Sequence, residues 1–252
     1  MVEELHLSSY RRLLWRRHHA LVVRGSFAEA RFCRDLYEAR HGIAAASGTA
    51  AVELDRALAA LALAGVALVE RESWGISVTL PGRDFGLFVG LEAEGMICGR
   101  IAPAEREGVL AVVQRQRAGG PLVQSTFEPP GADVVEVFEE YYRRVEQVPT
   151  RLGVTDGWEG ALIQSLPGGE LSFADGLPAG ELTDLIDRKI AAGDMEPMHE
   201  VLIFYECRCN DDLIRAMISS VSGDARADLF GREPALLIEC PRCGRGYSVR
   251  CG

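Results

Sequence analysis

Three common signatures of catalytic sites are missing from the sequence. It has no G-x-S-x-G nucleophile turn, no glycine-lysine phosphate loop and no H-E-x-x-H metalloprotease motif. No nucleophile, nucleotide site or catalytic zinc site of the usual kinds can therefore be assembled from local motifs. The sequence thus disfavours an enzyme and favours a protein that acts by binding.

Long apolar segments are missing as well. The longest uncharged apolar run, residues 57–69, is shorter than the roughly 20 residues that cross a bilayer. The first residues are acidic and then basic, without an apolar stretch and a small-residue cleavage site, so we expect no secretory signal and no membrane partner. We expect a cytoplasmic protein. In that reducing compartment, cysteines serve metal or redox chemistry more often than disulfides.

An excess of positive charge is also missing. The 252 residues include 27 Lys and Arg against 37 Asp and Glu, a formal net charge of -10, which repels nucleic acid. The basic segment 11–19 contains Leu13, Leu14 and Trp15, and we expect an amphipathic helix with a solvated basic face there. Hydrophobic residues at 48% and charged residues at 25% are typical of globular proteins and argue against extensive disorder.

Hydrophobic periodicity predicts an α+β fold. Apolar residues recur at helical spacing over residues 44–63 and again over 134–142. Between them, residues 76–80 and 85–91 alternate with period two, which is typical of antiparallel strands with one buried face. Further turn signals extend this strand region to about Phe127. The sequence therefore predicts an antiparallel-sheet core domain with packed helices, not an alternating βαβ fold.

Chain length and breaker residues predict three parts. A chain of 252 residues is at the upper limit of one compact domain, so we expect a main domain and a smaller appendage. We place the core domain at residues 1–176 and a helical linker at 177–206, with its helix near 181–192. The remaining residues, 207–252, form a small C-terminal lobe.

The lobe contains two close pairs of cysteines, Cys207-Arg208-Cys209 and Cys240-Pro241-Arg242-Cys243. Four thiolates in two such pairs can surround one zinc ion tetrahedrally, as in structural zinc sites. We therefore predict one Zn²⁺ per chain, bound by Cys207, Cys209, Cys240 and Cys243. Unligated buried cysteines and two permanent disulfides are the alternatives. His199 and Glu206 lie near in sequence, but four cysteines already complete a closed site without the open position of catalytic zinc.

The other three cysteines have simpler explanations. We expect Cys33 and Cys98 to be small buried residues in strand-like core segments, and Cys251 to be a free thiol near the end of the chain. Zinc-bound thiolates, in contrast, are nucleophiles whose oxidation to disulfides releases the ion. The lobe is therefore a candidate redox switch.

The sequence resembles the heat shock protein 33 family, bacterial redox-regulated chaperones with a C-x-C and a C-x-x-C pair at similar separation. The resemblance covers about residues 21–249 and includes motifs of the core domain in the family's order. These are His41-Gly42, the alanine-rich helix ending at Ala64-Gly65, Gly99-Arg100, Tyr141-Tyr142, residues 146–150 and Leu166-Pro167-Gly168-Gly169.

The resemblance implies an ATP-independent holdase. The reduced, zinc-bound protein is then folded and inactive. Oxidation of Cys207, Cys209, Cys240 and Cys243 to disulfides releases zinc, loosens the linker and the lobe, and exposes apolar surface to unfolding or oxidatively damaged client proteins. A homodimer on activation is implied in the same way.

The sequence departs from the family at Arg208, where an acidic residue is usual, and at Asn210, where Ser is common. Arg208 favours the thiolate form of its neighbours, which can speed oxidation or tighten zinc binding. Two other functions remain open: a constitutive chaperone with structural zinc, and a zinc-ribbon module for nucleic acid or a protein partner. Residues 207–252 contain seven arginines and six acidic residues, a balance that disfavours phosphate contacts.

Overall fold

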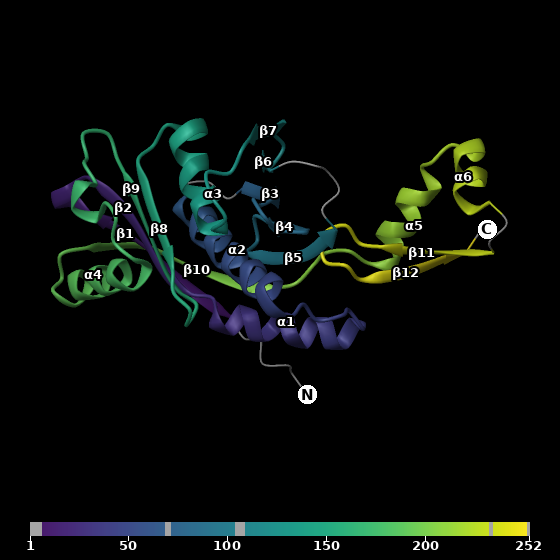
Figure 1. Ribbon diagram of the computed structural model, residues 1–252, viewed down its shortest axis with the longest axis horizontal. Coiled ribbons are helices and arrows are strands. Elements are labelled where there is room, and N and C mark those ends of the chain that lie inside the picture. Colours follow the sequence, from purple (N-terminus) through teal and green to yellow (C-terminus); the bar gives the residue numbers. More distant parts are fainter. Residues whose placement is uncertain (1–6, 69–71, 104–108, 232–233, 251–252) are drawn as a thin grey trace.

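The computed structural model describes residues 7–68, 72–103, 109–231 and 234–250. Ten strands form one sheet in the order β7-β6-β3-β4-β5-β10-β1-β2-β9-β8 (Figure 1). The strands are β1 (Ser8–Trp15), β2 (Ala20–Ser26), β3 (Glu72–Thr79), β4 (Phe85–Leu91), β5 (Met96–Pro103), β6 (Leu110–Arg117), β7 (Leu122–Phe127), β8 (Thr150–Val154), β9 (Glu159–Ser165) and β10 (Glu196–Tyr205).

Four helices cover this sheet. They are α1 (Ala28–His41), α2 (Gly48–Ala67), α3 (Val134–Tyr141) and α4 (Ala179–Ala191), with short turns η1 (Arg16–His18), η2 (Tyr142–Glu146) and η3 (Ser172–Ala174). Helix α2 is buried on nearly all sides because it contacts strands of both halves of the sheet, β4 and β5 on one side and β2 and β9 on the other. Figure 1 shows it at the centre of the molecule. Its alanines allow this close packing against several neighbours.

A second, smaller core lies between α4 and the neighbouring strands. Leu182 and Ile186 of α4 are fully buried, together with Trp15, Val22 and Ile163. The helix predicted near residues 181–192 is therefore present as α4, and it packs against β8 and β9. The apolar strand that follows it, β10, lies between β5 and β1.

Strand β10 joins the two halves of the sheet. It pairs with β1 in an antiparallel ladder from Ser8–Ile203 to Leu14–Glu196. Its pairing with β5 is parallel and contains two residue pairs, Phe204–Met96 and Tyr205–Ile97. We call this short junction the β5–β10 seam. All other neighbouring strands of the sheet pair antiparallel.

The C-terminal lobe contains α5 (Asp211–Ser219), α6 (Gly223–Phe230), β11 (Ala235–Glu239) and β12 (Gly246–Arg250). The last two strands form a separate antiparallel hairpin. In Figure 1 the lobe extends from one end of the sheet, beyond β4 and β5. Several large apolar side chains of the lobe are poorly covered, since Leu237 is 78% exposed and Met217 is 55% exposed.

The prediction of a helix over residues 11–19 is wrong. These residues form most of β1 and the turn η1. The pairing of β1 with β10 shifts between Arg12 and Leu13, so two consecutive residues are buried and the alternation of the strand is interrupted. This irregularity hid the strand behind an apparently amphipathic pattern.

The predicted α+β class is confirmed, as are the strands at residues 76–80 and 85–91 and the helix that became α2. Cys98 is buried in β5 as predicted, whereas Cys33 lies on α1, not in a strand, and is only partly buried. Among the residues that the structure describes, none of the helices combines the length and apolarity that a bilayer crossing requires. Strands β8 and β9 were not predicted because glycines surround them.

Candidate metal centre

The first cysteine pair is fixed between a strand and a helix. Immediately before it, the backbone N–H of Glu206 donates a hydrogen bond to the carbonyl oxygen of Ile97 at 3.0 Å, which continues the β5–β10 seam. Immediately after it, Asn210 caps α5 by accepting a hydrogen bond from the backbone N–H three residues further on, at 2.8 Å. Cys207 and Cys209 therefore lie on a short segment that is held at both ends.

The second pair lies on the turn between β11 and β12. The backbone N–H of Gly244 donates a hydrogen bond to the carbonyl oxygen of Cys240 at 2.9 Å. The backbone N–H of Cys240 donates one to the carbonyl oxygen of Arg245 at 2.8 Å. Gly244 has φ 81°, a left-handed conformation that glycine adopts without a steric penalty. This tight turn directs Cys240 and Cys243 to the same side of the hairpin.

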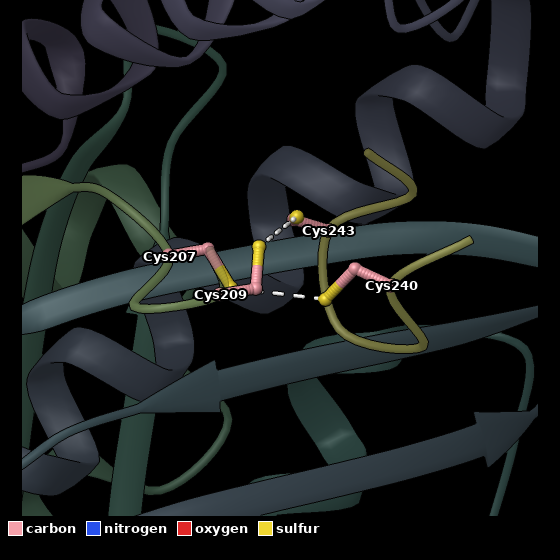
Figure 2. A group of neighbouring side chains, drawn as sticks. All are labelled: Cys207, Cys209, Cys240 and Cys243. Atoms are coloured by element: carbon pink, nitrogen blue, oxygen red, sulfur yellow. Dashed lines mark hydrogen bonds between the residues drawn. The ribbon is translucent and has the colours of Figure 1, made fainter. Parts of the chain in front are cut away.

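The two pairs face each other, as Figure 2 shows. The four sulfur atoms lie within 4.8 Å of one another and all four residues are buried. The Sγ atoms of Cys209 and Cys243 are 3.5 Å apart and those of Cys207 and Cys240 are 4.0 Å apart. Tetrahedral Zn–S bonds of about 2.3 Å require sulfurs about 3.8 Å apart. Because all four are free thiols at about this spacing, the cluster can hold a metal ion.

Two tyrosines place their hydroxyl groups against the sulfurs. The hydroxyl of Tyr247, on β12, donates to Cys209 Sγ at 3.0 Å. The hydroxyl of Tyr37, on α1, lies 3.5 Å from Cys243 Sγ, and its ring packs edge-on against Tyr205 at 5.5 Å between centroids. One hydroxyl thus comes from the lobe and one from the core. Such contacts around the ligands orient a site and tune its charge.

The crowded thiols do not ionise equally. Hydrogen bonds from Cys207 lower the pKa of Cys240, and lower that of Cys209 to about 6. The pKa of Cys207 is raised because it donates these bonds, first to Cys209. For Cys243, a hydrogen bond from Cys207 lowers the pKa, but its bonds with Cys209 and Cys240 outweigh this and the net change is upward. Cys209 and Cys240 are therefore the more readily ionised members of the cluster.

The structure thus brings together the four cysteines that the sequence singled out. Cys33 and Cys98 lie outside this cluster, and Cys251 is outside the described residues. The carboxylate of Glu206 accepts a hydrogen bond from the backbone N–H of Cys207 at 3.2 Å.

Sequence reasoning missed the two tyrosines. Tyr37 lies far upstream on α1, and no spacing rule connects it to the cysteines. Tyr247 is four residues after Cys243, but a strand tyrosine at that distance carries no metal-site signal by itself.

Comparison with known proteins gives consistent results. The model of the family described as Hsp33 protein matches residues 20–250. The 33 kDa chaperonin of Methylobacillus flagellatus is 24% identical over 159 residues, which cover 56% of this chain and 54% of the relative. That of Vibrio cholerae is 27% identical over 139 residues, 47% of this chain and 48% of the relative. These matches therefore span about half the length of the curated relatives.

A solved structure extends the likeness to nearly the whole fold. The crystal structure of the 33 kDa chaperonin from Thermotoga maritima, a heat shock protein 33 homologue, matches with a TM-score of 0.73 and 18% identity. The match covers 97% of this chain and 95% of that chain. At this identity it is the fold that is shared, while the family model matches well over half of the sequence. The chain therefore belongs to the Hsp33 family.

Proposed function

We propose that Cys207, Cys209, Cys240 and Cys243 bind one zinc ion, and that this site controls an ATP-independent holdase chaperone. The observation that carries the proposal is the approach of four buried sulfurs to within 4.8 Å of one another. Soft thiolate ligands in a closed tetrahedral set favour zinc over hard cations such as Mg²⁺ and Ca²⁺. When bound, zinc would neutralise part of the thiolate charge and join the lobe's two cysteine segments.

Zinc binding is expected to release protons. Near neutral pH, Cys207 and Cys243 retain theirs because their pKa values are raised, whereas metal ligation requires thiolates. Because these protons are displaced when zinc binds, the affinity for zinc falls as the pH is lowered. Calorimetric titration of the reduced metal-free protein in buffers of different ionisation enthalpy measures the number of protons. Binding without proton release would contradict this ligand set.

Oxidation supplies the switch. Two molecules of peroxide take four electrons from the four thiolates. Two sulfur–sulfur bonds would form and both O–O bonds would break to give hydroxide or water, so that the four cysteines could no longer hold the ion. The sulfurs are already within 4.8 Å, so modest movement brings any two to bonding distance. Loss of zinc then removes the main stabilising contribution to the lobe.

The oxidised protein would bind unfolding client proteins through apolar surface that packing no longer covers. The family membership and the partly exposed apolar residues of the lobe support this role. A reducing compartment such as the cytoplasm would keep the thiols free before stress. We extend the proposal to a homodimer of the active form, as the family resemblance implies.

The proposal is tested by following zinc and client together. Reduced, zinc-loaded protein is treated with peroxide or hypochlorite under mild unfolding, with a chromogenic chelator in one sample and an aggregating client in another. We expect about one zinc per chain to leave as light scattering by the client is suppressed. Mass spectrometry of the same samples should find disulfides among the four cysteines.

Two comparisons make this test specific. Protein kept in reductant should retain zinc and leave the client to aggregate. Client holding by the reduced protein would instead indicate a constitutive chaperone with structural zinc. Salt-dependent binding of nucleic acid by the reduced protein, without client holding after oxidation, would favour the zinc-ribbon alternative.

A further inference from the structure

The arginine inside each cysteine pair contacts the same buried carboxylate. Arg208 lies between Cys207 and Cys209, and its guanidinium Nη2 is 3.3 Å from Glu92 Oε2. Arg242 lies inside the other pair, and its Nη1 forms an ion pair with Glu92 Oε1. Glu92 belongs to the core, where it follows β4. One core side chain therefore connects to both halves of the cysteine cluster.

Glu92 is deeply buried and fixed by its own surroundings. It is 4% exposed, while Arg242 is 26% and Arg208 58% exposed in their side chains. Ser73 donates a hydrogen bond to Glu92 Oε2 at 3.0 Å, and the backbone N–H of Glu92 donates to the carbonyl oxygen of Met96 at 2.8 Å. Removing one partner from a buried ion pair leaves an uncompensated charge. The Glu92 carboxylate thus depends on the two arginines to compensate its charge. Moving the lobe away from the core would leave this charge either exposed to water or buried without an ion-pair partner.

The backbone of β4 leaves room for this contact. A Cβ atom on Gly90 would lie 2.9 Å from Arg242 Nη2, so the guanidinium packs directly over a position without a side chain. A second contact lies nearby on β5, where Arg100 donates to the carbonyl oxygen of Cys240 at 3.1 Å and pairs with Glu239 at 3.1 Å. Opposite charges on the core and the lobe therefore meet on both sides of the Cys240 turn.

We propose that Glu92 is a positioning residue that docks the lobe on the core sheet and thereby sets the rate at which metal leaves the four cysteines. By holding Arg208 and Arg242 on one carboxylate, it fixes the two cysteine pairs relative to each other. This inference rests on the proposed zinc site and concerns its regulation. It also gives a structural role to Arg208, one of the positions where this sequence departs from the family pattern.

The charges of the site link docking to the state of the sulfurs. Four thiolates around one divalent cation carry a net double negative charge. The two neighbouring arginines and the carboxylate that they share carry a net single positive charge, which balances part of it. Once the sulfurs are paired as disulfides and the metal has left, that negative charge is gone. Glu92 is then the carboxylate that both arginines still contact, and it holds the lobe until the lobe unfolds.

The test measures zinc release from reduced protein, without oxidant. Glu92→Gln keeps the size of the side chain and removes its charge. We expect it to speed transfer of zinc to an excess of chromogenic chelator at least about tenfold, the lower end of the effect of losing a partner outside the ligand shell. Arg242→Gln should have a similar effect and Arg208→Gln a smaller one, because Arg208 is more exposed. Combining Glu92→Gln with Arg242→Gln should add little to either change.

Glu72 provides a matched control. It is a core carboxylate with the same 4% side-chain exposure, held by Arg115 and Arg117 at 2.8 Å each. Glu72→Gln also breaks a buried ion-pair group in the sheet but does not touch the lobe. We expect it to lower core stability and leave the rate of zinc release at the wild-type value. Hydrogen exchange of residues 207–209 and 240–244 should increase in the Glu92 variant and not in this control.

The possible results separate the two proposals. Faster zinc release and exchange in Glu92→Gln and in the surface variant Arg208→Gln, with an unchanged Glu72→Gln, support the docking role. Wild-type rates in both Glu92→Gln and Arg242→Gln overturn it, even if zinc binds as proposed. If the wild-type protein binds no zinc, the metal site is wrong. Exchange at the two cysteine segments of the metal-free protein then still decides whether Glu92 docks the lobe.

Discussion

Replacement of Cys240 by serine is expected to unfold the C-terminal lobe while the ten-stranded sheet remains folded. A serine hydroxyl is a poor substitute for a thiolate on zinc, so the site would lose its closed tetrahedral set. Zinc contributes on the order of 10 kcal/mol or more to the folding of small zinc-dependent domains. Packing in the described part of the lobe leaves several large apolar side chains exposed.

Two features indicate that the lobe needs the proposed metal to fold. It spans only residues 207–252, close to the size below which chains usually need disulfides, metals or association to fold. In addition, much of its apolar surface lies in water, including Leu229 at 48% exposure. Its buried residues, among them Phe230 and Tyr247, gather around the cysteines themselves. Loss of the proposed metal would therefore separate the cysteines around which the buried residues of the lobe pack.

Hydrogen exchange followed by mass spectrometry tests this prediction directly. Amides of β11 and β12 should exchange at nearly the unfolded rate in Cys240→Ser, while those of β2 and β9 stay protected. Cys33→Ser is the control, since Cys33 lies on α1 outside the cluster. A Cys240→Ser protein that binds no zinc but keeps β11 and β12 protected would show that the lobe folds by packing alone.

Replacement of Asp55 by alanine is expected to destabilise the core domain by about 3–5 kcal/mol, the usual consequence of breaking a buried ion pair. The side chain of Asp55, on α2, is 2% exposed and pairs with Arg34 of α1, which is 3% exposed. Arg31 adds a hydrogen bond to Asp55 at 3.0 Å. The alanine variant would leave the Arg34 guanidinium buried without its main partner.

The pKa of Asp55 shows why the pair is costly to break rather than strongly stabilising. Burial raises this pKa, and the attraction of Arg34 and Arg31, which lowers it, does not fully compensate. An acid with a raised pKa is less favourable in its charged form after folding. The cost of burying it is therefore present in full above that pKa and is lost as the pH falls through it to the pKa of the unfolded chain. The double variant Arg34→Met with Asp55→Leu should therefore be less destabilised than Asp55→Ala.

Urea unfolding of the zinc-loaded, reduced proteins, followed by tryptophan fluorescence, measures these differences. Asp194→Ala is the control because Asp194 pairs with Lys189 on the surface, with side chains 43% and 35% exposed. We expect less than about 1 kcal/mol for that change. Equal losses for Asp55→Ala and Asp194→Ala would indicate that water or other residues compensate the buried arginine.

The parts of the fold that were predictable have a regular local pattern. Strand β3 alternates cleanly and β4 has an apolar residue at every second position. The four cysteines are recognisable from spacing alone. Strand β1 was mistaken for a helix because the irregularity beside Arg12 breaks its period. Tyr37 and Glu92 could not be assigned to the cysteine cluster for a different reason. Their positions depend on how α1 and the β4–β5 turn meet the lobe, and this is a property of tertiary packing that no local pattern contains.

The β5–β10 seam determines how a disturbance of the lobe is transmitted. A long antiparallel ladder resists separation because many hydrogen bonds share the load, but this seam has two residue pairs. Its last hydrogen bond, from Glu206 to Ile97, lies one residue before Cys207. A displacement of Cys207 would therefore break the hydrogen bonds of the seam one after another, while the β1–β10 ladder stays intact. The first cysteine pair thus adjoins the junction with the fewest residue pairs in the ten-stranded sheet.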